Sequence, residues 1–127
     1  MEYVALVTVL LVMQLMFFMG RVGMARGKYE IEAPAITGHE VFERTFRVHQ
    51  NTIEQLLLIL PSMWVCAHYT STTVAAGAGL AFLIGRFVYA AQYVADPKSR
   101  GPGMGIGFIA IVVCVVGALW GLVTTLV

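Results

Sequence analysis

Hydrophobic and polar positions follow one another along this chain in long blocks. Continuous apolar blocks cover about residues 3–19, 56–67, 72–93 and 104–127, and polar stretches separate them. A helix rises ~1.5 Å per residue, so about 17–25 apolar residues cross the hydrocarbon core of a membrane. The pattern therefore predicts membrane-spanning helices.

A polar connector at about residues 27–38 contains Pro34 and the Thr37-Gly38 pair, which break a helix. The second helix is therefore predicted to start at about His39, with a polar first half that leads into the apolar block ending at Ala67. The predicted spans are then residues 3–19, 39–67, 72–93 and 104–127. Thr37 and Glu40 have capping-box spacing, which predicts a helix start near Gly38. Pro61 predicts a kink in this second helix. Nothing repeats, so the predicted fold is a single domain over residues 1–127, an all-α integral membrane four-helix bundle.

Composition supports a membrane protein. Hydrophobic residues make up 59% of the chain and charged residues 12%, and the mean hydropathy is +0.83. A soluble domain has about 45–50% apolar and about 25% charged residues. The net charge of +1 and the lack of a long basic run give no reason to expect a nucleic-acid partner. No basic residue precedes Arg21 and no cleavage site follows the first apolar block, so we interpret that block as a retained span.

All eight basic residues surround the two connectors that follow the first and third spans: Arg21, Arg26, Lys28, Arg44 and Arg47 near the first, and Arg86, Lys98 and Arg100 near the second. Cytoplasmic loops of membrane proteins carry an excess of Lys and Arg. This distribution predicts that both connectors face the cytoplasm and that both termini lie on the other side.

Small and sulfur-containing residues in the apolar blocks predict packing. Cys66 and Cys114 lie within apolar runs, which is typical of buried core thiols. The three histidines are far apart and lack the spacing of metal ligands, so we expect no metal site. Two pairs of glycines have the G-x-x-x-G spacing of closely packed helices: Gly103/Gly107 and Gly117/Gly121.

The second helix carries a line of polar side chains where charge is costly. Positions i, i+4, i+8 and i+11 share one helical face, and here they hold Glu43, Arg47, Asn51 and Glu54. A charge at the centre of a membrane helix costs about 2.5–3.5 kcal/mol on the insertion scale. Anchoring at the headgroup level explains Lys98 well but explains the deeper Asn51 and Glu54 poorly.

The third span has a matching polar line. Arg86, Tyr89 and Tyr93 are spaced i, i+3 and i+7, and Arg100 follows one short loop later. Arginines bind carboxylates through paired hydrogen bonds, and a buried glutamate suits an ammonium group. The residues therefore predict a pocket for a small zwitterion with excess negative charge. Glutathione fits this chemistry, and other anionic peptides, nucleotides or lipid head groups fit nearly as well.

Four stretches resemble the MAPEG family, which includes microsomal glutathione transferases, leukotriene-C synthase and the lipoxygenase-activating protein. They are A-R-G-K-Y at residues 25–29, P-A-I-T-G at 34–38, F-E-R-T-F-R-V-H-Q-N-T-I-E at 42–54 and G-R-F-V-Y-A-A-Q-Y at 85–93, followed by Arg100. The chain departs from the family's common residues at Gly27, His49 and Gln55.

The resemblance implies a homotrimer of four-helix subunits, with glutathione held between neighbouring subunits on the cytoplasmic side. It implies that Arg26 and Arg47 bind the glutathione carboxylates, and that Asn51 and Glu54 hold its polar backbone and ammonium group. By the same resemblance, Tyr89 and Tyr93 line the site. Arg100 would be the catalytic residue, facing the sulfur and stabilising its thiolate.

The function implied is a membrane glutathione transferase or peroxidase. Its partners would be glutathione, a lipophilic second substrate, membrane lipid and two further copies of the chain, in a bacterial inner membrane or the endoplasmic reticulum. One alternative is a non-catalytic, lipid-binding scaffold of the same fold, although Arg100 favours the catalytic branch. Another is a small four-helix transporter, which usually needs an acid in the first span; the apolar run here has no ionisable side chain beyond Tyr3 at its edge.

Overall fold

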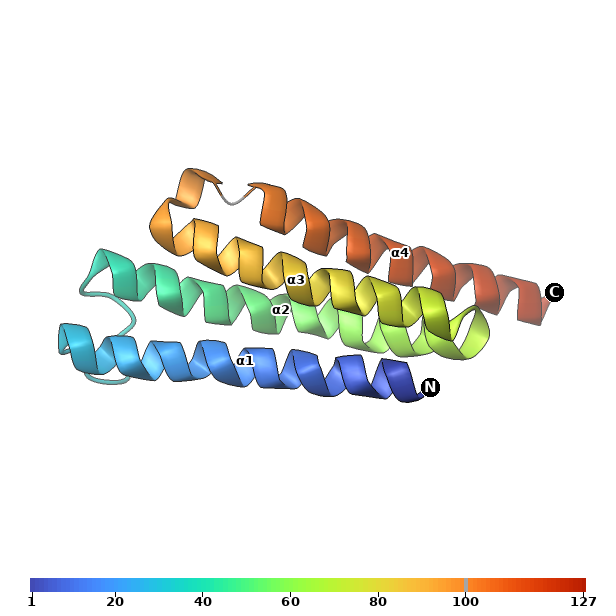
Figure 1. Cartoon of the computed structure of the whole chain (residues 1–127), viewed down its shortest axis with the longest axis horizontal. Helices are drawn as coiled ribbons and strands as arrows, with labels where there is room; N and C mark the ends of the chain where they lie inside the picture. The colour runs from blue at the N-terminus through green and yellow to red at the C-terminus, as the bar shows by residue number, and fades with distance from the viewer. Residues whose placement is uncertain (100) are drawn as a thin grey trace.

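The computed structural model of the chain describes residues 1–99 and 101–127. Its long helices are α1 (Glu2–Tyr29), α2 (Glu40–Tyr69), α3 (Thr72–Ala95) and α4 (Gly101–Leu126), with a short 3₁₀ helix, η1 (Pro97–Ser99), after α3. The long helices lie side by side with alternating directions (Figure 1). Both termini lie at the end of the bundle where the α2–α3 turn lies, and the two longer connections lie at the other end. The predicted all-α four-helix bundle is confirmed for the described residues.

The centre of the bundle is formed by α2 and α3. α1 packs against both of them, and so does α4. The largest fully buried apolar side chains come from all four helices: Leu11, Phe18, Phe42, Ile59, Met63, Phe82 and Cys114. Cys66 and Cys114 are buried free thiols in the same core, as predicted.

The outer faces of the bundle are apolar. Large hydrophobic side chains point away from the core along α1 and α4, such as Met13, Phe17, Val116 and Trp120. α1, α3 and α4 are long and apolar enough to cross a membrane. Exposed apolar area of this extent is unfavourable in water but suits lipid. The chain is therefore a membrane protein.

The helices extend beyond their predicted bounds: α3 ends at Ala95 and α4 begins at Gly101, and the larger differences are in α1 and α2. α1 continues past residue 19 to Tyr29, with Arg26 and Lys28 in its last turn, where cations interact favourably with the helix dipole. α2 is not among the helices apolar enough to span a membrane by itself. Its first half is polar, and its apolar second half packs inside the bundle between the other helices.

The start of α2 corrects the predicted capping box. The N-cap is His39, whose Nδ1 accepts a hydrogen bond from the backbone N–H of Val41 at 3.1 Å. Glu43 reaches back to accept from the N–H of Gly38 at 3.4 Å. Gly38 has φ +141°, a conformation that side chains rarely allow. The glycine turn places the N-cap two residues beyond Thr37, the N-cap of the predicted capping box.

Close helix packing uses three of the four predicted glycines. A Cβ on Gly103 would collide with the backbone of Tyr89, and one on Gly121 would collide with Thr70. A Cβ on Gly117 would lie 2.7 Å from the sulfur of Cys66, whereas Gly107 has room for an ordinary contact. Gly103 thus brings the start of α4 directly against the tyrosine end of α3.

Candidate functional site

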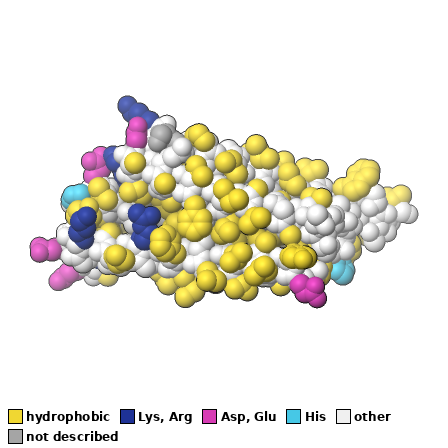
Figure 2. All heavy atoms as spheres, in the orientation of Figure 1, with side chains coloured by type: hydrophobic (Ala, Val, Ile, Leu, Met, Phe, Trp, Pro, Cys, Tyr) yellow, Lys and Arg dark blue, Asp and Glu magenta, His cyan; other side chains and the backbone are white. Residues whose placement is uncertain are grey.

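Charged side chains gather at one end of the bundle. Figure 2 shows Lys and Arg side chains at the end with the two longer connections, and a hydrophobic surface along the rest of the visible face. Most Asp and Glu side chains in this view lie at the same end. A polar ligand would therefore find its partners there.

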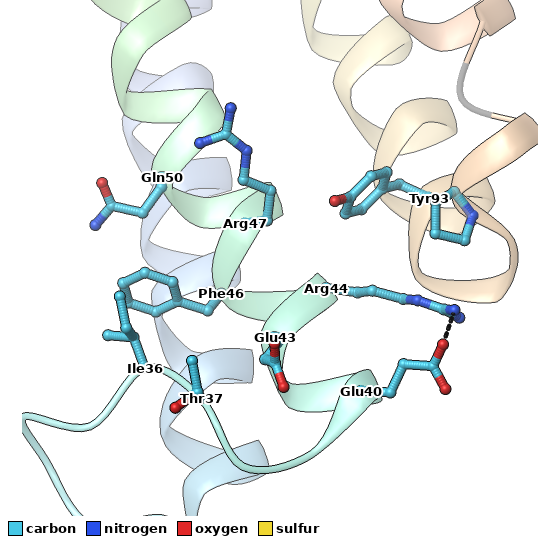
Figure 3. A pocket seen from close by; sticks show the side chains of 10 residues that line it. Ile36, Thr37, Glu40, Glu43, Arg44, Phe46, Arg47, Gln50 and Tyr93 are labelled. Atoms are coloured by element: carbon cyan, nitrogen blue, oxygen red, sulfur yellow. Dashed lines mark hydrogen bonds and ion pairs between the residues drawn. The ribbon is translucent and has the colours of Figure 1, made fainter.

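An open cavity lies at this end, between the first connection, α2, the last turn of α3 and η1 (Figure 3). We call it the outer cavity. Its volume is about 840 Å³, within the ~300–1,000 Å³ of typical small-molecule sites. Its lining includes both signs of charge and one tyrosine: Ile36, Thr37, Glu40, Glu43, Arg44, Phe46, Arg47, Gln50, Tyr93 and Pro97.

Arg44 joins two walls of the outer cavity. It forms an ion pair with Glu40, one turn earlier on α2. Its Nη1 also donates to the carbonyl of Val94 on α3 at 3.3 Å. Arg44 is thus committed to partners within the chain and holds the ends of α2 and α3 together.

Arg47 and Glu54 remain accessible. Their side chains are 54% and 57% exposed, and Arg47 Nη1 lies 3.8 Å from Glu54 Oε1. Exposed pairs of this kind are worth about 0–1 kcal/mol. A ligand carboxylate could therefore replace Glu54 as the partner of Arg47 at little cost. Figure 3 shows Tyr93 reaching from α3 toward Arg47 across the cavity.

A second set of polar residues, which we call the inner layer, lies inside the bundle. Arg86 on α3 is 2% exposed, and its Nη2 donates to Asn51 Oδ1 at 2.8 Å and to Thr52 Oγ1 at 2.9 Å. Its guanidinium carbon lies 4.2 Å from the ring centroid of Tyr89. Among residues 1–99 and 101–127, no carboxylate forms an ion pair with Arg86. The charge is stabilised by neutral acceptors and an aromatic face.

Two tyrosines connect the inner layer to the outer cavity. The rings of Tyr89 and Tyr93 stack with centroids 5.4 Å apart at 17°. Tyr89 is 2% exposed, whereas Tyr93 is half-buried and lines the outer cavity. Within this chain, Tyr93 can touch a ligand in the cavity and Tyr89 supports it from behind.

Arg26 lies apart from the outer cavity. Its Nη1 donates to the carbonyl of Ala35 at 2.7 Å, and its guanidinium lies 5.0 Å from the ring centroid of Phe42. It therefore fastens the first connection to the start of α2. Among the predicted site residues, Arg47 and Tyr93 line the outer cavity, and Glu54 is exposed beside Arg47 without lining it. Asn51 and Tyr89 are buried in the inner layer.

The predicted catalytic residue, Arg100, lies outside the described residues. In the parts of the chain that are described, no group of three or more His, Cys, Asp or Glu side chains could hold a metal. The sequence interpretation missed Thr52, whose hydroxyl accepts a hydrogen bond from the same Arg86 nitrogen as the Asn51 amide oxygen. Its position directly after Asn51 on the core side of the helix was the available signal.

Comparison with known proteins gives consistent matches over nearly the whole chain. The model of the MAPEG family matches residues 4–120. An uncharacterized protein of Synechocystis sp. is 43% identical over 115 residues, which cover 91% of this chain and 84% of that protein. Microsomal glutathione S-transferase 2 of Homo sapiens is 34% identical over 117 residues, 91% of this chain and 79% of that protein. The protein of the same name from Mus musculus is 33% identical over 109 residues, 84% of this chain and 74% of its own length. The resemblance found in the sequence is confirmed.

Proposed function

Because this chain belongs to the MAPEG family, we propose that it binds glutathione at the charged end of the bundle and uses it as a glutathione transferase. The observation that carries the proposal is the outer cavity, where the accessible Arg47 faces Tyr93. Similarity to microsomal glutathione S-transferase 2 supports the choice of glutathione among the anionic ligands that would suit such a cavity.

The proposed ligand contacts match charge and hydrogen-bonding groups of glutathione. Glutathione has two carboxylates, one ammonium group and a thiol. Arg47 is accessible to one carboxylate, and Glu54 beside it suits the ammonium group. Asn51 holds the polar backbone of the peptide, with Tyr93 and the supporting Tyr89 forming the wall.

Arg26 contributes to the site from a different position. It lies on α1 near the first connection, so we propose that it binds the second carboxylate of a glutathione held by a neighbouring subunit in a homotrimer. An arginine has five N–H donors, so its bond to Ala35 leaves others for this role. The half-exposed Arg47 and Glu54 leave the side of the outer cavity open to a neighbouring subunit, which is compatible with such an assembly. Native mass spectrometry of the detergent-solubilised protein measures the number of subunits directly.

Arg100 is the proposed catalytic residue. A thiol with a pKa near 8.5 needs a drop of ~1.5 units to be mostly thiolate at neutral pH, which corresponds to about 2 kcal/mol. One hydrogen bond from a charged donor supplies ~1.5–3 kcal/mol. The thiolate then attacks the electrophilic carbon of a lipophilic substrate, and the leaving group departs with the bonding electrons. With a lipid hydroperoxide, two glutathione molecules would instead form a disulfide, an alcohol and water.

The distribution of basic residues supports a cytoplasmic location for this site. Water-soluble glutathione would enter from that side, while the second substrate would arrive through the surrounding lipid. Because one substrate comes from water and the other from lipid, the site must lie at the membrane boundary. The outer cavity meets this requirement, since it lies at the polar end of an apolar bundle.

The experiment that tests the proposal is a glutathione titration of the purified protein in detergent at neutral pH. The ultraviolet difference absorbance of the thiolate reports activation, and calorimetry on the same sample reports binding. A saturable thiolate signal, together with turnover of a chloronitrobenzene electrophile, is the expected result. Binding without a thiolate signal would favour the non-catalytic scaffold. Absence of binding would overturn the glutathione assignment.

A further inference from the structure

Arg86 is the most deeply buried charge in the described part of the chain. It lies within α3, with 2% of its surface exposed, in the interior of a membrane bundle. Charged residues at such positions are costly and usually serve a function. Arg86 does not line the outer cavity, so any role in the site must operate through the residues that it touches.

The contact with Asn51 fixes the direction of the Asn51 amide. An arginine carries N–H donors and no acceptor, so the Asn51 atom 2.8 Å from Arg86 Nη2 must be the oxygen. The amide nitrogen then points away from Arg86. In the described residues that nitrogen has no hydrogen-bond partner. Two N–H donors are thus presented on the side opposite the inner layer.

Asn51 does not itself line the outer cavity, but its neighbours on α2 place it at the edge of that cavity. Asn51 follows Gln50 directly and Arg47 by one helical turn, and both of those line the outer cavity. The Thr52 side chain is also fixed by Arg86: its hydroxyl accepts a hydrogen bond from Arg86 and donates one to the carbonyl of Val48 at 2.7 Å. The backbone and both acceptors of this turn are therefore fixed relative to α3.

We propose that Arg86 is a positioning residue that locks the Asn51 amide so that its N–H groups donate to a carbonyl or carboxylate oxygen of the ligand. This inference rests on the proposed binding of glutathione and makes it more specific. Asn51 then binds an acceptor group of the ligand, and Glu54 binds the ammonium group. The locked amide loses no rotational freedom when the ligand arrives, which favours binding.

The test compares glutathione dissociation constants of four proteins: wild type, Arg86→Met, Asn51→Ala and the double variant. If Arg86 acts through Asn51, Arg86→Met weakens binding about fivefold in the wild-type background and has no further effect when Asn51 is alanine, because coupled residues are non-additive. Multiplicative effects of the two changes would overturn the proposal. Wild-type protein that binds no glutathione would overturn the proposed function, and this inference with it.

Asn51→Asp provides an independent test if Arg86→Met fails to fold. Aspartate keeps an oxygen for Arg86 and adds an ion pair, so the thermal midpoint should equal or exceed that of the wild type. It also replaces the outward N–H donors with an acceptor, so glutathione binding should weaken at least tenfold, the effect of ~1.5 kcal/mol. Binding as tight as wild type would overturn the proposal.

A control separates these effects from general loss of packing. Gln14 is 2% exposed on α1, and its Nε2 donates to the carbonyl of Leu83 on α3 at 2.8 Å. Gln14→Leu removes another buried polar contact between helices, away from the outer cavity. It should change the thermal midpoint and leave the glutathione dissociation constant unchanged. A change in that constant comparable to the Arg86→Met effect would show that any loss of packing weakens binding, and would overturn the assigned role.

Discussion

The outer cavity and the inner layer are polar regions of the same two helices, and they differ in burial and in bonding. Arg47 lines the outer cavity and pairs with Glu54 beside it; both side chains are more than half exposed and lie 3.8 Å apart. In the inner layer, Arg86 is almost fully buried and has hydrogen bonds of 2.8 and 2.9 Å to neutral acceptors. Exposed charges contribute little to stability and are free to bind, whereas buried polar groups fix the geometry around them.

The largest expected effect is on thiolate formation and turnover, for which neither the outer cavity nor the inner layer is sufficient by itself. Arg100→Ala should remove the thiolate absorbance and lower turnover about a hundredfold, because removing one donor to a developing or fixed negative charge has effects of ~10²–10³. Binding should persist, since the outer cavity keeps its own cation. Stopped-flow absorbance and calorimetry measure the two properties separately.

Lys98→Ala is the matched control for Arg100→Ala, because Lys98 is an exposed cation of η1, close to Arg100 in the sequence. It should retain the thiolate signal. Equal loss in both variants would mean that general positive charge, and not Arg100 itself, stabilises the thiolate.

The next largest effect concerns the stability of the inner layer. Thr52→Val removes an acceptor from a buried cation, so it should lower the free energy of unfolding by about 2 kcal/mol, within the ~1.5–3 kcal/mol typical of hydrogen bonds to charged groups. Denaturant titration in detergent measures this change. Thr45→Val is the control in the same helix: its hydroxyl bonds the carbonyl of Val41 within α2 and does not touch Arg86. If both variants lose the same stability, the inner layer has no special energetic role.

Arg47→Ala should affect ligand binding and not stability, the opposite of what we expect for Thr52→Val. We expect glutathione binding to weaken about tenfold, because a charge-assisted bond to a carboxylate is lost. Stability should change by less than about 1 kcal/mol, since the partner Glu54 is exposed. Calorimetry and thermal unfolding provide the two numbers. Lys28→Ala, an exposed cation at the end of α1, is the control. A large loss of stability in Arg47→Ala would abolish the distinction between the two regions.

The smallest expected effect is that of salt. At ~1 M salt the Debye length falls to about 3 Å, so exposed charges are screened while buried ones are not. Glutathione binding to the wild type should weaken a few-fold between low and high salt, with a smaller change in Arg47→Ala. The unfolding midpoint depends on the buried inner layer and the apolar core, so we expect salt to change it little. Salt-independent binding would mean that Arg47 makes no electrostatic contribution.

The line of polar side chains on α2 shows how far the sequence leads. Helical spacing correctly placed Arg47, Asn51 and Glu54 on neighbouring positions of one face. It could not show that Asn51 turns inward to Arg86 while Arg47 and Glu54 remain outside, because that depends on where α3 packs. Similarly, the first connection was predicted, but the bond of Arg26 to Ala35 depends on the path of the chain around Gly38.

The sequence by itself determined the class of protein, the number of helices and the family. These properties depend on block lengths, composition and local motifs, which a single chain carries without reference to its neighbours. The tertiary structure alone decided which polar groups are accessible and which are locked inside, since burial and partner choice arise when helices pack. For this protein, that packing separates the cation that can meet a ligand, Arg47, from the cation that holds the site in shape, Arg86.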